Sequence, residues 1–294
     1  MGTLYSQLIV GLINGCFYAL LSLGLAVIFG MLNIVNFAHG ALFMTGAFLA
    51  WIGLTQVGPW LGYDNFQISY WWALLLVPLI VGALGVVIER TMLKHLYRVD
   101  PLYGMLLTFA LAWILEGLFR HWYGATGRPY EIPDELYGVV DLGFLLLPLY
   151  RVWVVAAAIV ACLGTWLLIE RTKLGAYLRA ATENPKLVEA FGINVPVLVT
   201  LTYGFGVALA AFAGVLAAPI MQVSPKMGAD LIIIVFAVVV VGGMGSIMGS
   251  IVTGLFLGVI EGLTKVFYPE ASAIVIFLIM SIVLMIRPAG LFGR

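Results

Sequence analysis

Polar residues interrupt this otherwise apolar chain at two glycine-rich places. One is the stretch FGMLNIVNFAHGAL at residues 29–42, and the other is VGGMGSIMGS at residues 241–250. Glycine lets a helix unwind, and the freed backbone N–H and C=O groups can then bind a polar solute. Two broken helices of this kind are typical of a transport path through a membrane, although a tight surface loop explains each stretch equally well. The candidate path residues are Asn33, Asn36, His39, Gly40, Gly242, Gly243, Gly245 and Ser246.

A further polar stretch, GAYLRAATENPKLVEAFGIN, covers residues 175–194. Asn184 suits an N-cap, Pro185 the first helical position and Gly192 the C-terminal stop, so we expect two short helices broken at residues 184–185. Leu187 and Phe191 then share one apolar face of the second helix. That face must be buried, either against another protein or against the membrane surface of this chain itself.

The sequence lacks the residue sets that enzymes and metal sites need. No lysine follows a glycine and precedes a serine or threonine, so the P-loop of an ATPase is absent, as are H-E-x-x-H and G-x-S-x-G. His39, His95 and His121 are far apart, and Cys16 and Cys162 lie singly inside apolar runs. We therefore expect no enzyme activity, no metal site, no disulfide and no cofactor bound by this chain.

The composition indicates which elements must position these residues. Hydrophobic residues make up 63% of the 294 residues and charged residues 10%, whereas soluble domains contain about 25% charged residues. Such a chain is a multi-pass membrane protein, and its net charge of zero gives no reason to expect nucleic acid as a partner. We predict an all-α bundle of transmembrane helices in contact with membrane lipid.

Nine apolar runs are candidates for these helices. We interpret eight of them as full spans, whereas the run at 231–241 is too short to cross about 30 Å of hydrocarbon. It leads into the second glycine-rich stretch, so a re-entrant or broken helix is expected near 231–246, giving about eight to nine spans. The runs cover residues 4–29, 37–61, 71–88, 102–119, 152–169, 197–218, 231–241, 247–266 and 273–286.

The positions of lysine and arginine predict the orientation, because cytoplasmic loops are rich in both. Nine of the 14 basic residues would share one face of the membrane, and five would share the other. This bias places residues 175–194 in the cytoplasm, and the N-terminus and the acidic loop at 130–141 outside. The nine are Arg90, Lys94, Arg98, Arg171, Lys173, Arg179, Lys186, Arg287 and Arg294.

Carboxylates are scarce in the middle of the predicted spans. Glu89 and Glu116 lie near span ends, and Glu261 lies in the outer portion of its run. Ion-driven transporters keep buried carboxylates for coupling, so their scarcity indicates that energy enters this protein from elsewhere. Glu116 and Glu261 nevertheless leave an ion-coupled secondary transporter as the alternative class.

Small residues recur at every fourth position in two of the runs. This spacing places them on one stripe of a helix, where they let a neighbouring backbone approach closely. They are Gly206, Ala210, Gly214 and Ala218 in one run, and Gly254, Gly258 and Gly262 in the other.

Four segments together resemble the LivH-type permeases of branched-chain amino acid ABC importers. They are NIVNFAHGALFMTGAF, LRAATENPKLVEAFGINV, VVVVGGMGSIMGSIVTGLFLGVIEGL and RPAGLFGR. The resemblance runs from the first span to the last residue, and it implies a single permease domain over residues 1–294 in a bacterial or archaeal cytoplasmic membrane. Branched-chain amino acids are the implied substrates, with other amino acids, urea, short amides and aromatic carboxylates as alternatives.

The resemblance also implies partners. They are a LivM-type second permease, two cytoplasmic ATPases that use ATP and Mg, and a periplasmic binding protein. Residues 175–194 would correspond to the coupling segment, whose short helix sits in a groove of the ATPase, although Phe191 stands where the family's EAA pattern has alanine. The implied coupling residues are Arg179, Glu183, Asn184, Pro185, Leu187, Glu189, Ala190, Phe191 and Gly192.

Overall fold

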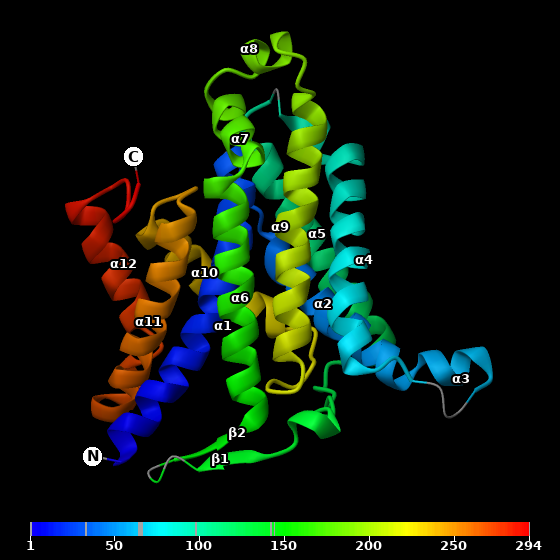
Figure 1. Cartoon of the computed structure of the whole chain (residues 1–294), viewed down its shortest axis with the longest axis vertical. Coiled ribbons are helices and arrows are strands. Elements are labelled where there is room, and N and C mark those ends of the chain that lie inside the picture. The colour runs from blue at the N-terminus through cyan, green and yellow to red at the C-terminus, as the bar shows by residue number, and fades with distance from the viewer. Residues whose placement is uncertain are drawn as a thin grey trace. The chain divides into compact units, whose positions relative to one another are not determined.

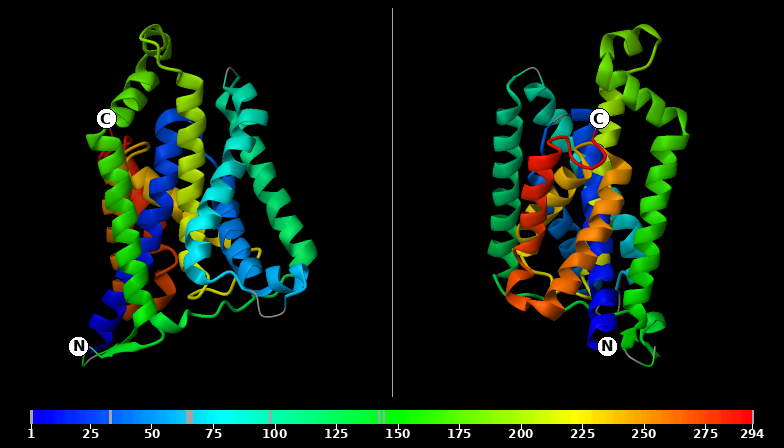
Figure 2. Two further views of the ribbon diagram at one scale, coloured as in Figure 1. Left: turned by 45° about the vertical axis from the view of Figure 1, so that its right-hand side comes forward. Right: turned by 90° about the vertical axis from the view of Figure 1, so that its left-hand side faces the viewer.

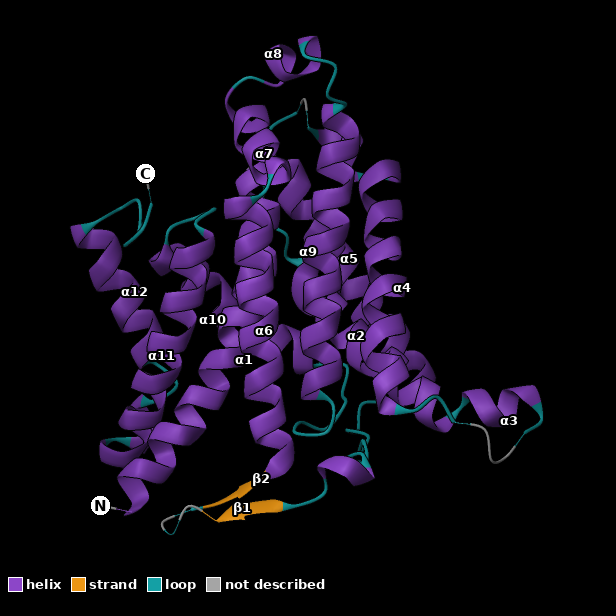
Figure 3. Cartoon of the chain, viewed as in Figure 1, coloured by secondary structure: helices purple, strands orange, loops and turns teal. Residues whose placement is uncertain are grey.

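The computed structural model describes residues 2–32, 34–63, 67–97, 99–141, 143 and 145–293. Figure 3 shows that these residues are mostly helical, with two short strands. The chain divides into two compact units: Met1–Met31, Glu135–Val195 and Ile233–Arg294 form unit 1, and Leu32–Asp134 and Pro196–Ile232 form unit 2. The prediction of one permease domain is not tested by this division and stays a prediction.

Unit 1 is built around the three long helices α1, α6 and α11 and the segments that follow them. Its elements are α1 (Gly2–Leu32), β1 (Val139–Asp141), β2 (Leu146–Pro148), α6 (Leu149–Arg171), α7 (Lys173–Glu183), α8 (Pro185–Ala190), α11 (Ile247–Phe267), η3 (Pro269–Ala271) and α12 (Val275–Ile286). The strands pair antiparallel, with Val140 opposite Leu147. Figures 1 and 2 show α7 and α8 at one end of α6, and the strands and the N-terminus of α1 at the other.

Unit 2 contains most of the remaining helices. They are α2 (Ala38–Thr55), α3 (Val57–Leu61), α4 (Tyr70–Thr91), η1 (Leu93–Leu96), α5 (Pro101–Tyr123) and nearly all of α9 (Val195–Ala217). The short η2 (Asp134–Leu136) stands at the boundary between the units, and α10 (Met227–Gly242) begins in unit 2 and continues into unit 1.

The predicted spans agree with the helices, with three differences. Seven helices in the described part of the chain are long and apolar enough to cross a membrane: α1, α2, α4, α5, α6, α9 and α11. The run at 37–61 is two helices, because the chain breaks at Gln56. The run at 231–241 forms a helix of 16 residues that begins earlier, at Met227, and spans only about 24 Å.

The third difference concerns the last run, at 273–286, which was predicted as a full span. It forms the 12-residue helix α12, because the preceding residues are used by η3 and its turn. At about 18 Å this helix is shorter than the hydrocarbon layer. The chain is therefore a bundle of long and short apolar helices rather than of uniform spans.

Small residues form the helix contacts in both units, as the fourfold spacing predicted. In unit 1, α1 and α11 run antiparallel, and a methyl group on Gly11 would lie 2.6 Å from the carbonyl oxygen of Gly258. In unit 2, a methyl group on Gly46 of α2 would lie 2.6 Å from the Cα of Ala211 in α9. Such backbone-to-backbone approach is what small residues permit, and it positions the polar groups described below.

Candidate functional site

The segment α7–α8 has the geometry predicted from its sequence. The backbone N–H of Leu187 donates to Asn184 Oδ1 at 3.1 Å, which makes Asn184 the N-cap of α8 with Pro185 as the first helical residue. Gly192 adopts a positive φ of 82° and donates its N–H to the carbonyl of Glu189 at 2.9 Å. The helix therefore begins and ends with its terminal backbone groups bonded.

Two large apolar side chains of this segment face away from the protein. Leu187 is 55% exposed and Phe191 is 78% exposed, whereas Val188 between them is buried at 6%. The buried face of α8 thus includes Val188, whereas Leu187 and Phe191 lie on its exposed face. We call Leu187 and Phe191 the α8 apolar pair.

Arg179 holds α7 against the end of α6. Its guanidinium donates to the carbonyl oxygen of Ile169 at 3.2 Å and to Glu170 Oε2 at 3.2 Å. Leu178 and Ala181 are buried on the same helix. Of the predicted coupling residues, Arg179 thus anchors the segment, whereas Glu183, Glu189 and Ala190 are exposed.

Removing the cap of α8 tests how far this geometry depends on Asn184. We expect Asn184→Ala to destabilise α8 by about 1 kcal/mol, because the Leu187 N–H loses its acceptor. Faster hydrogen exchange at residues 185–190, with unchanged exchange in α6, would show it. Thr182→Ala is the matched control, because the Thr182 hydroxyl donates to the carbonyl oxygen of Arg179 within α7 and not to α8. Equal exchange in both variants would contradict the capping role.

The predicted path residues of the first glycine-rich stretch lie in unit 2. Asn36 is buried and donates from Nδ2 to the Tyr203 hydroxyl at 3.1 Å, and its Oδ1 has no hydrogen-bond partner among the described residues. His39 is also buried, and Gly40 packs against Gly228 and Ile232 at the start of α10. Asn33 lies outside the described residues.

The residues of the second glycine-rich stretch lie in unit 1 and form the tight turn between α10 and α11. Gly243 and Gly245 have positive φ values of 97° and 83°, which only glycine adopts readily. Ser246 Oγ accepts the N–H of Gly249 at 3.1 Å and so caps α11. From the first stretch, Gly30 meets this turn, since a methyl group on Gly245 would lie 3.1 Å from the Gly30 Cα.

The C-terminal residues bond to the end of α10, which the sequence did not predict. The N–H of Leu291 donates to the carbonyl of Val241 at 2.9 Å, and the N–H of Phe292 donates to that of Gly242 at 3.2 Å. These bonds satisfy carbonyls that a helix end otherwise leaves free. Apart from residues 29–31, which belong to unit 1, the first glycine-rich stretch thus lies in unit 2, whereas the second lies in unit 1. Their role in a transport path stays a prediction.

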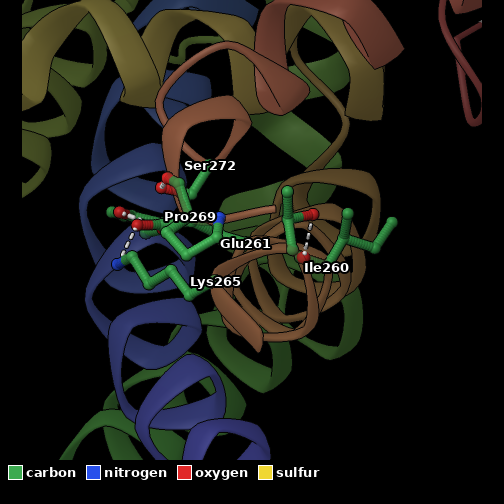
Figure 4. Close-up of polar contacts among 7 residues, drawn as sticks. Ile260, Glu261, Lys265, Pro269 and Ser272 are labelled. Atoms are coloured by element: carbon green, nitrogen blue, oxygen red, sulfur yellow. Dashed lines mark hydrogen bonds and ion pairs between the residues drawn. The ribbon is translucent and has the colours of Figure 1, made fainter. Parts of the chain in front are cut away.

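The carboxylates near the span ends are paired. Lys265 donates to Glu261 Oε1 at 2.5 Å on the next turn of α11, as Figure 4 shows, and the Tyr18 hydroxyl donates to Glu261 Oε2 at 2.7 Å. Arg120 donates to Glu116 at 2.6 Å on α5. Both glutamates therefore have structural partners, and Glu261 joins α11 to α1.

Glu89 is a polar centre that was not predicted as a site residue. It is 1% exposed, and it accepts from the Tyr97 hydroxyl at 2.7 Å and the Thr200 hydroxyl at 2.6 Å. Burial and the adjacent Glu89 carboxylate raise the pKa of Tyr97, so its hydroxyl stays protonated and donates. No group of three or more His, Cys, Asp or Glu within the described ranges could hold a metal.

Comparison with known proteins gives a consistent result along the whole chain. The family model described as "Branched-chain amino acid transport system / permease component" matches residues 7–284. The chain is 30% identical to the high-affinity branched-chain amino acid transport system permease protein BraD of Pseudomonas aeruginosa, with 98% of this chain and 95% of BraD aligned.

Other relatives extend the comparison to a second bacterium and an archaeon. The chain is 27% identical to the high-affinity branched-chain amino acid transport system permease protein LivH of Escherichia coli, over 98% of this chain and 95% of the relative. It is 28% identical to a probable LivH of Methanocaldococcus jannaschii over 99% and 90%. No solved structure matches the chain significantly.

Proposed function

The chain belongs to the permease family of branched-chain amino acid transport systems, and from this premise we propose that it translocates branched-chain or related amino acids inward, driven by separate cytoplasmic ATPases. As an ABC importer permease it is a multi-pass protein of the cytoplasmic membrane. The proposal adds the substrate and the source of energy to this family assignment.

The exposed α8 apolar pair is the observation that carries the proposal. An ATP-driven permease without a P-loop must receive force from another protein through a surface outside the membrane. The segment α7–α8 offers such a surface, and it is linked to the bundle on both sides: Arg179 bonds α7 to α6, and α9 follows α8 along the chain. Exposed apolar side chains that the fold keeps on the surface in this way are typical of protein interaction sites.

In the proposed mechanism the partners supply recognition and energy. A periplasmic binding protein delivers the amino acid to the outer face, and a LivM-type permease completes the path. Two ATPases, which use ATP and Mg, close on nucleotide and displace α7–α8. The helices next to each glycine-rich stretch then rearrange within their own units, and neutral groups such as Asn36 in unit 2, Ser246 in unit 1 and freed backbone groups offer hydrogen bonds to the zwitterion. Weak, neutral contacts suit passage, because deep binding would trap the solute.

The paired carboxylates support ATP rather than an ion gradient as the driving force. Glu261 is bonded to Lys265 and Tyr18, and Glu116 is bonded to Arg120. A coupling carboxylate must instead exchange its ion in each cycle. The ion-driven alternative would require these pairs to break.

Reconstitution into proteoliposomes tests the proposed function. We expect the chain, assembled with the permease, ATPase and binding-protein products of neighbouring genes, to accumulate radiolabelled leucine, isoleucine or valine only when ATP is supplied. The chain alone should accumulate none under a proton or sodium gradient. Uptake by the lone chain under an ion gradient would overturn the mechanism. ATP-driven uptake of urea or benzoate in preference to the amino acids would overturn the substrate assignment.

A further inference from the structure

Glu89 is held in unit 2 by contacts that the proposed mechanism has not used. Its carboxylate is almost completely buried, and each oxygen accepts one hydroxyl hydrogen bond, from Tyr97 and from Thr200. Burying a carboxylate is unfavourable unless its oxygens are bonded. A residue of this kind at an apolar helix contact therefore indicates a role that an apolar side chain would not fulfil.

The carboxylate lies at the end of the contact between α4 and α9. Gly82 and Gly85 share a helix face with Glu89, because they precede it by seven and four residues. A methyl group on Gly82 would lie 3.1 Å from the Gly204 carbonyl oxygen, and one on Gly85 would lie 2.9 Å from the Val207 Cβ. Thr200 is one turn from Gly204 on α9. The apolar contact at these glycines thus ends in the directional bond between Glu89 and Thr200.

Thr200 connects this contact to the segment that precedes α9 along the chain. It lies in the second turn of α9, which begins at Val195 directly after the α7–α8 segment. Its hydroxyl lies 3.0 Å from the Pro196 carbonyl as well as 2.6 Å from Glu89. The Val207 side chain packs over Gly85 and the Val86 side chain over Gly204, so the rest of this contact is apolar and carries no directional bond. A hydrogen bond to a buried carboxyl oxygen, by contrast, requires one register of the two helices.

We propose that Glu89 is a positioning residue that makes α9 and α4 move as one body when partner proteins displace α7–α8. The inference rests on the proposed function and assigns a new residue to it. Tyr97 extends the same connection from Glu89 to the loop after η1. Loss of Glu89 then lets α9 slide along α4, so ATP is hydrolysed without a matching movement of the path.

The test measures amino acid imported per ATP hydrolysed by the complete reconstituted complex. We expect Glu89→Met, which removes both acceptors at similar volume, to lower this ratio about tenfold while the ATPases still copurify. Glu89→Gln should keep the ratio within about twofold of wild type, because its amide can accept from Tyr97 and donate to Thr200. The matched control is Glu261→Met, which removes the other buried, tyrosine-bonded carboxylate from a contact without α9.

Thr200→Val keeps the test decisive if Glu89→Met fails to accumulate. It preserves shape, leaves Glu89 in place and should lower the same ratio. Where Glu89→Met accumulates, adding Thr200→Val should lower its ratio no further, because Glu89→Met already breaks the Glu89–Thr200 bond. A wild-type ratio in Thr200→Val, or equal ratios in Glu89→Met and Glu261→Met, would overturn the role of Glu89. Absence of ATP-driven import by the wild-type complex would instead refute the proposed function itself.

Discussion

We expect the double substitution Leu187→Asp and Phe191→Asp to abolish ATPase association and ATP-driven import, while the chain still inserts into the membrane. The two side chains are 55% and 78% exposed, so their loss removes little internal packing of the permease. In an interface, however, buried apolar anchors often contribute about 2 kcal/mol or more each. Two carboxylates in an apolar groove add a further desolvation penalty. Copurification of the ATPases with a tagged permease measures the effect.

Tyr137→Asp is the matched control for this experiment. Tyr137 is also 78% exposed, and it precedes β1 by two residues in the chain. Figure 1 shows β1 at the end of α6 opposite α7 and α8. The substitution makes the same change from an exposed aromatic ring to a carboxylate, and ATPase copurification should be unaffected. If the Leu187/Phe191 variant retained the ATPases as well as Tyr137→Asp does, the coupling assignment would be wrong.

Gly258→Val is expected to prevent stable folding of unit 1. A methyl group at this position would overlap the Cα and N atoms of Gly15 and lie 2.6 Å from the carbonyl oxygen of Gly11. These are backbone atoms, so no side chain can rotate to make room, and α1 and α11 must separate. Overpacking of this kind destabilises by about 3 kcal/mol or more. The amount of monodisperse protein in detergent, and its unfolding temperature, measure the loss.

Gly164→Val provides the control for added volume and altered helix propensity. Gly164 lies in α6 of the same unit, and a methyl group there would meet nothing within 4 Å. We expect this variant to accumulate like wild type. Equal yields and unfolding temperatures for Gly258→Val and Gly164→Val would contradict the close approach of α1 to α11.

Local features of the fold were predictable from the sequence. Each of the nine apolar runs contains helix. A run of this length predicts a helix even where the residues at which the helix begins and ends are uncertain. The start of α8 followed from Asn184 and Pro185, whose capping chemistry involves only the next few residues. The exposed α8 apolar pair followed from the same local geometry.

Features that join distant residues were not predictable in this way. Glu89 was noted as a carboxylate near a span end, but its bond to Thr200 depends on how α4 meets α9. The bond from Leu291 to Val241 likewise joins residues separated by two helices. The glycine spacing predicted close packing but not the partner helix, since any small-residue stripe permits approach from several neighbours.

The capping of α10 by Leu291 and Phe292 has a consequence for biogenesis. The ribosome must complete α11 and α12 before it makes the residues that close α10. Until then the carbonyl end of that helix depends on water or the translocation machinery for its hydrogen bonds. Closure of this helix end therefore has to follow the synthesis of α11, α12 and the turn after them.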